Sequence, residues 1–267
     1  MTSIHLALRY FLTLTVTLSA LTVISNDASA AGWGSLKGKF LYKGSVNPKE
    51  ITPTRDPEFC GKHKLVEEDI AVGEKNELAN VYVYLYTKRN AKVEIHPDYE
   101  KAELKPAVLD NKGCRFEPHA MTVWTKQPFQ VHNSDQGIGH NTNATLRANG
   151  SFNETVTNDK PLKKSFQKTE TYPAPVACNV HPWMNATLLI RDNPYMAVSN
   201  EKGEFEIKNL PAGEHEIVFW HEASGTMKNL QVGKEKAGRT GRIDVEIADG
   251  ETLDFGEITV TPKLLGK

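Results

Sequence analysis

One short segment of this 267-residue chain brings together three side chains that can bind a soft metal ion. Cys178, His181 and Met184 follow one another at spacings of three, between two stretches that read as strands. A thiolate, an imidazole and a thioether on one tight loop can converge on a single centre. These donors suit copper that alternates between Cu(I) and Cu(II), whereas calcium and magnesium prefer oxygen donors and structural zinc takes four Cys or His ligands. The loop therefore indicates a copper site.

A second imidazole must come from elsewhere in the chain, and His140 is the natural candidate. It lies on a glycine-containing loop just after the apolar stretch from Phe129 to Val131. Two histidines, one cysteine and a weak axial methionine are the ligand set of blue-copper electron-transfer sites. We therefore predict one copper ion held by His140, Cys178 and His181, with Met184 as the axial ligand.

The Cys-x2-His-x2-Met loop, with an upstream Asn-x-Asp and His-Asn, resembles the cupredoxin family, and its loop length is most similar to that of the amicyanin-like members. The matching stretch runs from about residue 114 to residue 192 and includes Phe116-x-Pro118 before a strand. The resemblance implies a Greek-key β-sandwich that binds copper at one end.

The same resemblance implies roles for the neighbours of the ligands. The residue that matches His181 is the partly exposed ligand through which electrons pass. The residue that matches Asn141 ties the two ligand loops together. Pro182 and Trp183 would form an apolar rim on which a redox partner docks.

The chain has three cysteines, and a metal thiolate at Cys178 would leave Cys60 and Cys114. Two thiols in an exported chain most simply form a disulfide, which would join the polar N-terminal segment to the copper domain. The alternative is a second metal site, because Cys60 and His63 repeat the Cys-x2-His spacing. Its ligands would then be Cys60, His63, Cys114 and His119.

Residues 1–30 are typical of a secretory signal peptide. Arg9 precedes an uncharged apolar run over 10–24, and Ala28-Ser29-Ala30 predicts cleavage after Ala30. We therefore expect a periplasmic or secreted protein. No other segment is long and apolar enough to span a bilayer, so the mature chain is predicted to have no membrane span.

The formal net charge is -1, from 32 basic and 33 acidic side chains. This balance argues against a strongly basic nucleic-acid-binding protein, so no nucleic acid is expected as a partner. A redox partner, which the sequence leaves unidentified, is expected to dock on a local apolar patch around His181.

Short apolar and β-branched runs, separated by turn signals, predict an all-β fold, and long helical periodicity is absent. We expect a Greek-key cupredoxin β-sandwich and a second small β-sandwich. The predicted strands lie within residues 36–42, 81–87, 121–131, 187–190, 204–207, 214–220, 243–247 and 253–260.

The domain division follows from a composition shift near residue 193. Residues 31–193 form the predicted cupredoxin-like domain, with a core at about 104–193 and an extension over 31–103. Residues 194–262 resemble a carboxypeptidase-regulatory-like (transthyretin-like) sandwich, on the pattern Gly203-x-Phe205-x-Ile207 followed by Leu210-Pro211-x-Gly213. In an alternative arrangement, strands from 34–87 complete this second domain and the cupredoxin is nested inside it.

Together these features predict an exported mononuclear copper protein that carries single electrons between redox partners. A periplasmic copper carrier or scavenger is one alternative, since the same ligands bind Cu(I). A structural surface β-module with a degenerate metal loop is another. We find no convincing catalytic constellation and do not expect an enzyme, because a type 2 copper centre would need three further imidazoles in register.

Overall fold

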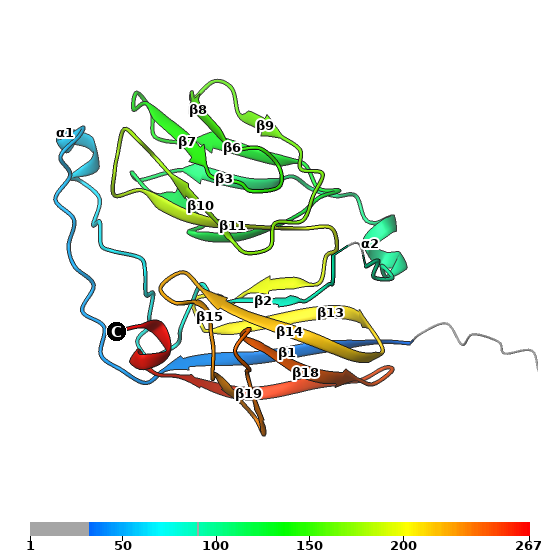
Figure 1. Ribbon diagram of the computed structural model, residues 1–267. Helices are drawn as coiled ribbons and strands as arrows, with labels where there is room; N and C mark the ends of the chain where they lie inside the picture. The colour runs from blue at the N-terminus through cyan, green and yellow to red at the C-terminus, as the bar shows by residue number, and fades with distance from the viewer. Residues whose placement is uncertain (1–31, 90) are drawn as a thin grey trace, which may run out of the picture. The chain divides into compact units, whose positions relative to one another are not determined.

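The computed structural model describes residues 32–89 and 91–267, so the predicted signal peptide lies outside the described residues. Regular structure is almost entirely β, which confirms the predicted fold class (Figure 1). The helices are α1 (Pro57–Cys60), α2 (Pro97–Lys101) and the 3-10 helix η1 (Pro262–Leu265). Within these described ranges, no helix has the length and apolar character needed to cross a membrane.

Sandwich A is built from residues 107–191. One sheet has the strand order β5-β11-β10-β7-β8, and the other has the order β4-β3-β6-β9. Alternate side chains of both sheets point into one shared core, as expected for strands that each bury one face. The strands are β3 (Ala107–Asn111), β4 (Phe116–Glu117), β5 (Ala120–Trp124), β6 (Phe129–Asn133), β7 (His140–Ala144), β8 (Phe152–Val156), β9 (Leu162–Lys164), β10 (Ala174–Ala177) and β11 (Asn185–Arg191).

Sandwich B combines strands from both ends of the chain. One sheet has the order β13-β1-β19, and the other has the order β12-β2-β14-β15, with β18 also paired to β14. These two sheets enclose a second core. The strands are β1 (Trp33–Tyr42), β2 (Tyr82–Leu85), β12 (Met196–Val198), β13 (Glu204–Pro211), β14 (Gly213–His221), β15 (Gly225–Thr226), β18 (Arg242–Ile247) and β19 (Thr252–Val260), and a small hairpin adds β16 (Gln231–Val232) and β17 (Glu235–Lys236).

The strand pairing places sandwich A within an interruption of sandwich B. Strand β1 lies between β13, to which it runs antiparallel, and β19, to which it runs parallel. Strand β2 pairs with β12 and β14. The chain therefore forms two strands of sandwich B, continues through the whole of sandwich A, and then returns to sandwich B.

Strands β2 and β11 each contribute to two apolar layers. In β2, Val83 and Leu85 face the core of sandwich B, whereas Tyr82 and Tyr84 face sandwich A. In β11, Leu189 faces sandwich B and its neighbours face the core of sandwich A. Burial on both faces explains why these two strands read as continuous apolar runs rather than as alternating ones.

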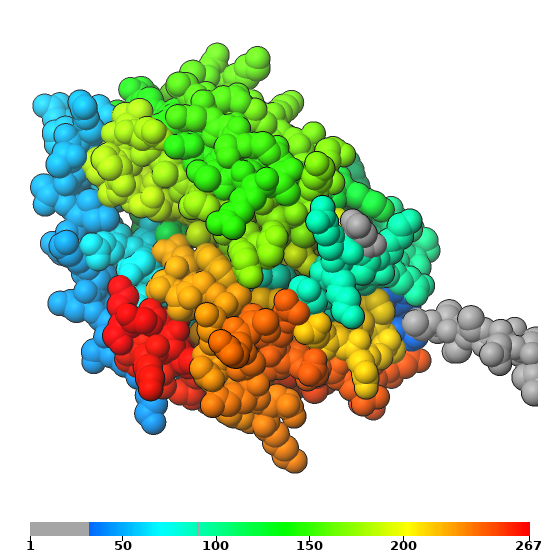
Figure 2. Space-filling view, viewed as in Figure 1, coloured from blue at the N-terminus to red at the C-terminus, as the bar shows by residue number. Residues whose placement is uncertain are grey.

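A long connection between β1 and β2 carries α1. We call residues 43–66 of this connection the strap. Its two arms lie antiparallel where Ile51 donates to the Leu65 carbonyl at 3.0 Å. The disulfide between Cys60 and Cys114 joins the strap to sandwich A, which confirms the predicted pairing. Figure 2 shows the blue strap beside yellow-green residues of sandwich A.

The contact between the sandwiches generates a stability prediction. The buried Tyr82 hydroxyl donates to Thr187 at 2.8 Å and accepts from the Met121 N–H at 3.0 Å. Tyr82→Phe leaves that buried N–H without an acceptor, which should lower the free energy of unfolding by about 1–3 kcal/mol. Urea unfolding measures the loss.

The matched control is Tyr172→Phe, because the Tyr172 side chain is 48% exposed. We expect this variant to lie within about 0.5 kcal/mol of the parent protein. Equal losses of stability in the two variants would contradict a structural role for the Tyr82 hydroxyl.

Candidate metal centre

Strand pairing brings the two predicted ligand segments together. Strand β7 begins at His140, and β10 ends one residue before Cys178. The two strands run antiparallel with Ala177 opposite Asn143, so the chain that continues past β10 runs toward the His140 end of β7. The loop after β10 is closed by its own backbone, since the Met184 N–H donates to the His181 carbonyl at 2.9 Å and the Cys178 N–H donates to the Met184 carbonyl at 3.1 Å.

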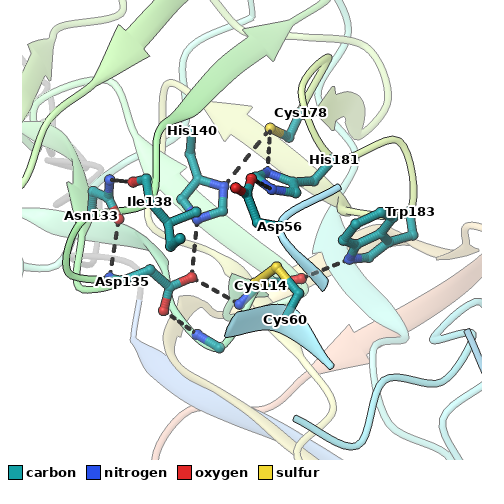
Figure 3. The surroundings of a disulfide bond; sticks show 11 residues. Asp56, Cys60, Cys114, Asn133, Asp135, Ile138, His140, Cys178, His181 and Trp183 are labelled. Atoms are coloured by element: carbon teal, nitrogen blue, oxygen red, sulfur yellow. Dashed lines mark hydrogen bonds and ion pairs between the residues drawn. A yellow bond between two sulfur atoms is a disulfide. The ribbon is translucent and has the colours of Figure 1, made fainter. Parts of the chain in front are cut away.

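Three buried side chains converge there. The Cys178 Sγ atom lies 4.0 Å from His140 Nδ1 and 3.9 Å from His181 Nδ1, and the three ligand atoms lie within 4.8 Å of one another (Figure 3). An ion bonded to an imidazole nitrogen at about 2.0 Å and to a thiolate at about 2.3 Å holds these atoms about 3.7 Å apart in a trigonal arrangement. The three donors therefore fit a single transition-metal ion both in type and in spacing.

A carboxylate orients the first imidazole. His140 Nε2–H donates to Asp135 Oδ2 at 3.0 Å. The Asp135 carboxylate also accepts from the backbone N–H groups of Gly113 at 2.6 Å and Cys114 at 2.8 Å. Because Nε2 is engaged in this way, Nδ1 is the nitrogen left for a metal.

A second carboxylate orients the other imidazole. His181 Nε2–H donates to Asp56 Oδ2 at 2.9 Å, across 125 residues of sequence. Figure 3 shows Asp56 beside the His181 ring, with Cys178 on the other side of that ring. The strap therefore contributes directly to the surroundings of the candidate site.

Burial of His181 corrects one expectation. The resemblance implies a partly exposed imidazole, but the exposed fraction of His181 is 0%. Asp56 from the strap is hydrogen-bonded to its outer nitrogen, and the Trp183 ring packs against it in an edge-to-face contact with a centroid separation of 5.2 Å. The expectation was wrong because the strap comes from a distant part of the sequence.

Asn141 connects the two ligand segments. Its side-chain Oδ1 accepts from the backbone N–H groups of Asn179 at 2.8 Å and Val180 at 3.3 Å, and it lies 3.4 Å from Cys178 Sγ. These contacts hold the start of the Cys178 loop against β7.

The other predicted residues lie around the same loop. The Met184 side chain is buried in the core of sandwich A together with Cys178. Pro182 is exposed. Trp183 is partly buried, and its Nε1–H donates to the Cys114 carbonyl at 3.1 Å. Beside them, Val180 exposes 42% of its surface.

Cys60 and Cys114 are bonded to each other, which excludes the alternative second metal site. His119, which that alternative included, bonds elsewhere. Its Nε2 lies 2.8 Å from Glu222 Oε2, in a contact between the two sandwiches. Cys178 is the one free cysteine.

When no metal is bound, the surroundings of the site lower the pKa of the Cys178 thiol and raise the pKa of the His140 imidazole. Burial by itself raises the pKa of Cys178, but hydrogen bonds from His140 and His181 outweigh it and lower the pKa from 9.0 to about 5. Burial by itself lowers the pKa of His140, but Asp135 and Cys178 outweigh it and raise that pKa. A metal ion at His140 Nδ1 would therefore compete with a proton for that nitrogen.

The two orienting carboxylates differ in how well the sequence signals them. Asp135 belongs to the Asn-x-Asp pattern five residues before His140, so a local signal exists. Asp56 lies in a polar stretch far from every predicted ligand, and no pattern in the sequence singles it out.

Comparison with family models finds no match, and no curated protein matches the chain. Solved structures do match. A copper-containing nitrite reductase from Thermus scotoductus SA-01 is 15% identical over 32% of this chain, which spans 22% of that enzyme, with a TM-score of 0.29. A purple cupredoxin from Nitrosopumilus maritimus is 14% identical over 32% of this chain and 98% of its own, with a TM-score of 0.26. Amicyanin from Paracoccus versutus is 14% identical over 41% of this chain and 97% of its own, with a TM-score of 0.29.

The thiolate generates a testable pH dependence. In the metal-free protein, the ultraviolet absorbance of the Cys178 thiolate should appear with a midpoint at about pH 5, instead of near its ordinary pKa of 9.0. The thiolate should persist at all higher pH values and be lost as the pH falls through that midpoint.

Cys178→Ser should abolish this titration, because the other two cysteines form a disulfide. His140→Gln should move the midpoint upward, since it removes a hydrogen bond that lowers the pKa of the thiol. A midpoint near 9 in the folded parent protein would contradict the geometry described for the site.

Proposed function

We propose that this chain is an exported copper protein of the cupredoxin type, with one ion that alternates between Cu(I) and Cu(II) and carries single electrons. One observation carries the proposal. His140, Cys178 and His181 converge with their ligand atoms within 4.8 Å of one another in a buried site. This set combines two imidazoles with one thiolate, which is the set that one-electron copper sites use.

His140, Cys178 and His181 would hold the ion, with Met184 as the axial ligand. Copper, when bound, supplies the one-electron couple. The protein holds the ligands in nearly fixed positions, because Asp135 and Asp56 orient the imidazoles and Asn141 anchors the loop. A rigid ligand frame keeps the structural change between the two oxidation states small.

Burial favours electron transfer over copper carriage. A carrier must accept and release its ion, so its ligands need an open face. Here the exposed fractions of His140, Cys178 and His181 are 0%, 2% and 0%. The same enclosure leaves no open ligand position for a substrate, which favours a carrier of electrons over an enzyme.

We further propose that a redox partner docks on the apolar residues of the loop, namely Val180, Pro182 and Trp183. The first is 42% exposed and the second is also exposed, and the Trp183 ring contacts the ring of His181. A partner bound there would be connected to the ion through Trp183 and His181, whose rings are in contact.

Sandwich B is proposed to be a carboxypeptidase-regulatory-like module. The chain turns at Pro211-Ala212-Gly213 between β13 and β14, which belong to opposite sheets of the sandwich, and Gly213 has a φ of 120° there. The module would support sandwich A, because buried aromatic residues join the two sandwiches.

The visible spectrum tests the copper proposal. Addition of Cu(II) to the purified protein should produce an intense thiolate-to-copper charge-transfer band, and Cys178→Ser should abolish it. A colourless protein that binds only Cu(I) would support a copper carrier instead. A protein that binds neither ion would contradict both functions.

The axial ligand has a separate test. Met184→Leu keeps an apolar side chain of similar volume but removes the thioether, which should raise the reduction potential. A tenfold change in the Cu(II)/Cu(I) equilibrium corresponds to about 59 mV for one electron, and we expect a shift of that order.

Met121→Leu is the matched control, because Met121 is buried in the same core but lies on β5, away from the loop. Its reduction potential should equal that of the parent protein. Equal potentials in all three proteins would contradict axial ligation by Met184.

A further inference from the structure

Asp56 precedes a helix but does not make the hydrogen bond that is usual for aspartate there. It is the N-cap of α1, yet its side chain makes no capping hydrogen bond. Aspartate at this position usually accepts from the first free N–H groups of the helix, which contributes about 1 kcal/mol. The carboxylate of Asp56 accepts instead from His181 Nε2, at 2.9 Å.

The backbone conformation of Asp56 is also unusual for an N-cap residue. Its φ of 45° and ψ of 46° lie in the left-handed region, which residues with a side chain adopt at an energetic cost. The disulfide at Cys60, at the end of α1, fixes the next turn of the strap to sandwich A. The strap thus holds one acidic side chain over one imidazole, with backbone angles outside the β region that an N-cap residue usually adopts.

We propose that Asp56 is a positioning residue for the metal ligand His181, and that the strap is a cap over this edge of the copper site. The proposal rests on the proposed function, because it assigns a role at the same centre. The Asp56 carboxylate accepts the Nε2 proton, so the Nδ1 lone pair points at the position shared with Cys178 and His140. The cap also replaces the water that would otherwise solvate the outer edge of the ring.

The charge of Asp56 has a further effect. A negative charge close to the imidazole stabilises the more positive oxidation state of an ion bound to it. Asp56 is 44% exposed on its side chain, so solvent reduces this effect but does not remove it. Asp56 should therefore lower the reduction potential of the site.

The experiment compares Asp56→Asn with Glu58→Gln in the full chain. Both substitutions remove one negative charge, and Glu58 is an exposed residue in the first turn of the same helix. Asp56→Asn should favour Cu(I) by roughly tenfold, a rise of about 59 mV, with a changed charge-transfer band. Glu58→Gln should change the potential several-fold less and leave the band unchanged.

A second measurement needs no copper. Nitrogen NMR of the metal-free protein should show a slowly exchanging proton on His181 Nε2, and Asp56→Ala should lose that protection while Glu58→Gln retains it. Equal potentials in Asp56→Asn and Glu58→Gln, or unchanged Nε2 protection in Asp56→Ala, would overturn the positioning role.

The two proposals fail in different ways. If the parent protein gives no thiolate-to-copper band, the proposed function fails, whereas the NMR comparison still tests whether Asp56 orients His181. If the band is present but Asp56→Asn behaves as Glu58→Gln does, only the positioning role is lost.

Discussion

Two hydrogen bonds from imidazole to carboxylate determine the rest of the candidate metal centre. Asp135 and Asp56 engage the Nε2 atoms of His140 and His181, and both Nδ1 atoms then face Cys178. Each carboxylate is in turn linked to the disulfide. Asp135 accepts from the backbone N–H of Cys114, and Asp56 lies one helical turn before Cys60 (Figure 3). One covalent bond outside the ligand set thus supports both imidazoles, and this arrangement is consistent with the general observation that the partners of metal ligands fix ring orientation.

Both sandwiches contribute to the position of this centre. Sandwich A supplies the three converging ligands, and its β7 and β10 strands set their spacing. The strap with Asp56 originates at β1 and leads to β2, so both of its ends are set by sandwich B. The buried contact of Tyr82 with Thr187 fixes β2 against β11, the strand that follows the Cys178 loop. The position of Asp56 therefore depends on how the two sandwiches pack.

Sequence patterns predicted the local features of this protein and missed those that depend on distant packing. The all-β class followed from short apolar runs, and the pairing of Cys60 with Cys114 followed from cysteine arithmetic. Cys178, His181 and Met184 came from residue type and spacing within one loop, because a tight loop constrains its side chains to one region. His140 came from the need for a second imidazole. Asp56 could not be found in this way, since only the path of the strap brings it to His181. The burial of His181 was missed for the same reason. The segment that forms β2 gave the strongest strand signal in the sequence. That both of its faces are buried is explained only by the two layers that pack against it.

The position of β1 has a consequence for the order in which the protein can assemble. This first strand lies in the middle of its sheet, between β13 and the last strand, β19. Because β19 follows all of sandwich A in the chain, β1 has no parallel neighbour until the whole of sandwich A, a continuous stretch of chain, has been synthesised. Sandwich A can therefore fold first, and the bond between Cys60 and Cys114 can form before sandwich B closes. Until β19 pairs with it, the central strand β1 has an unpaired edge. An unpaired strand edge can pair with the wrong segment, so the chain is most exposed to misassembly at this stage.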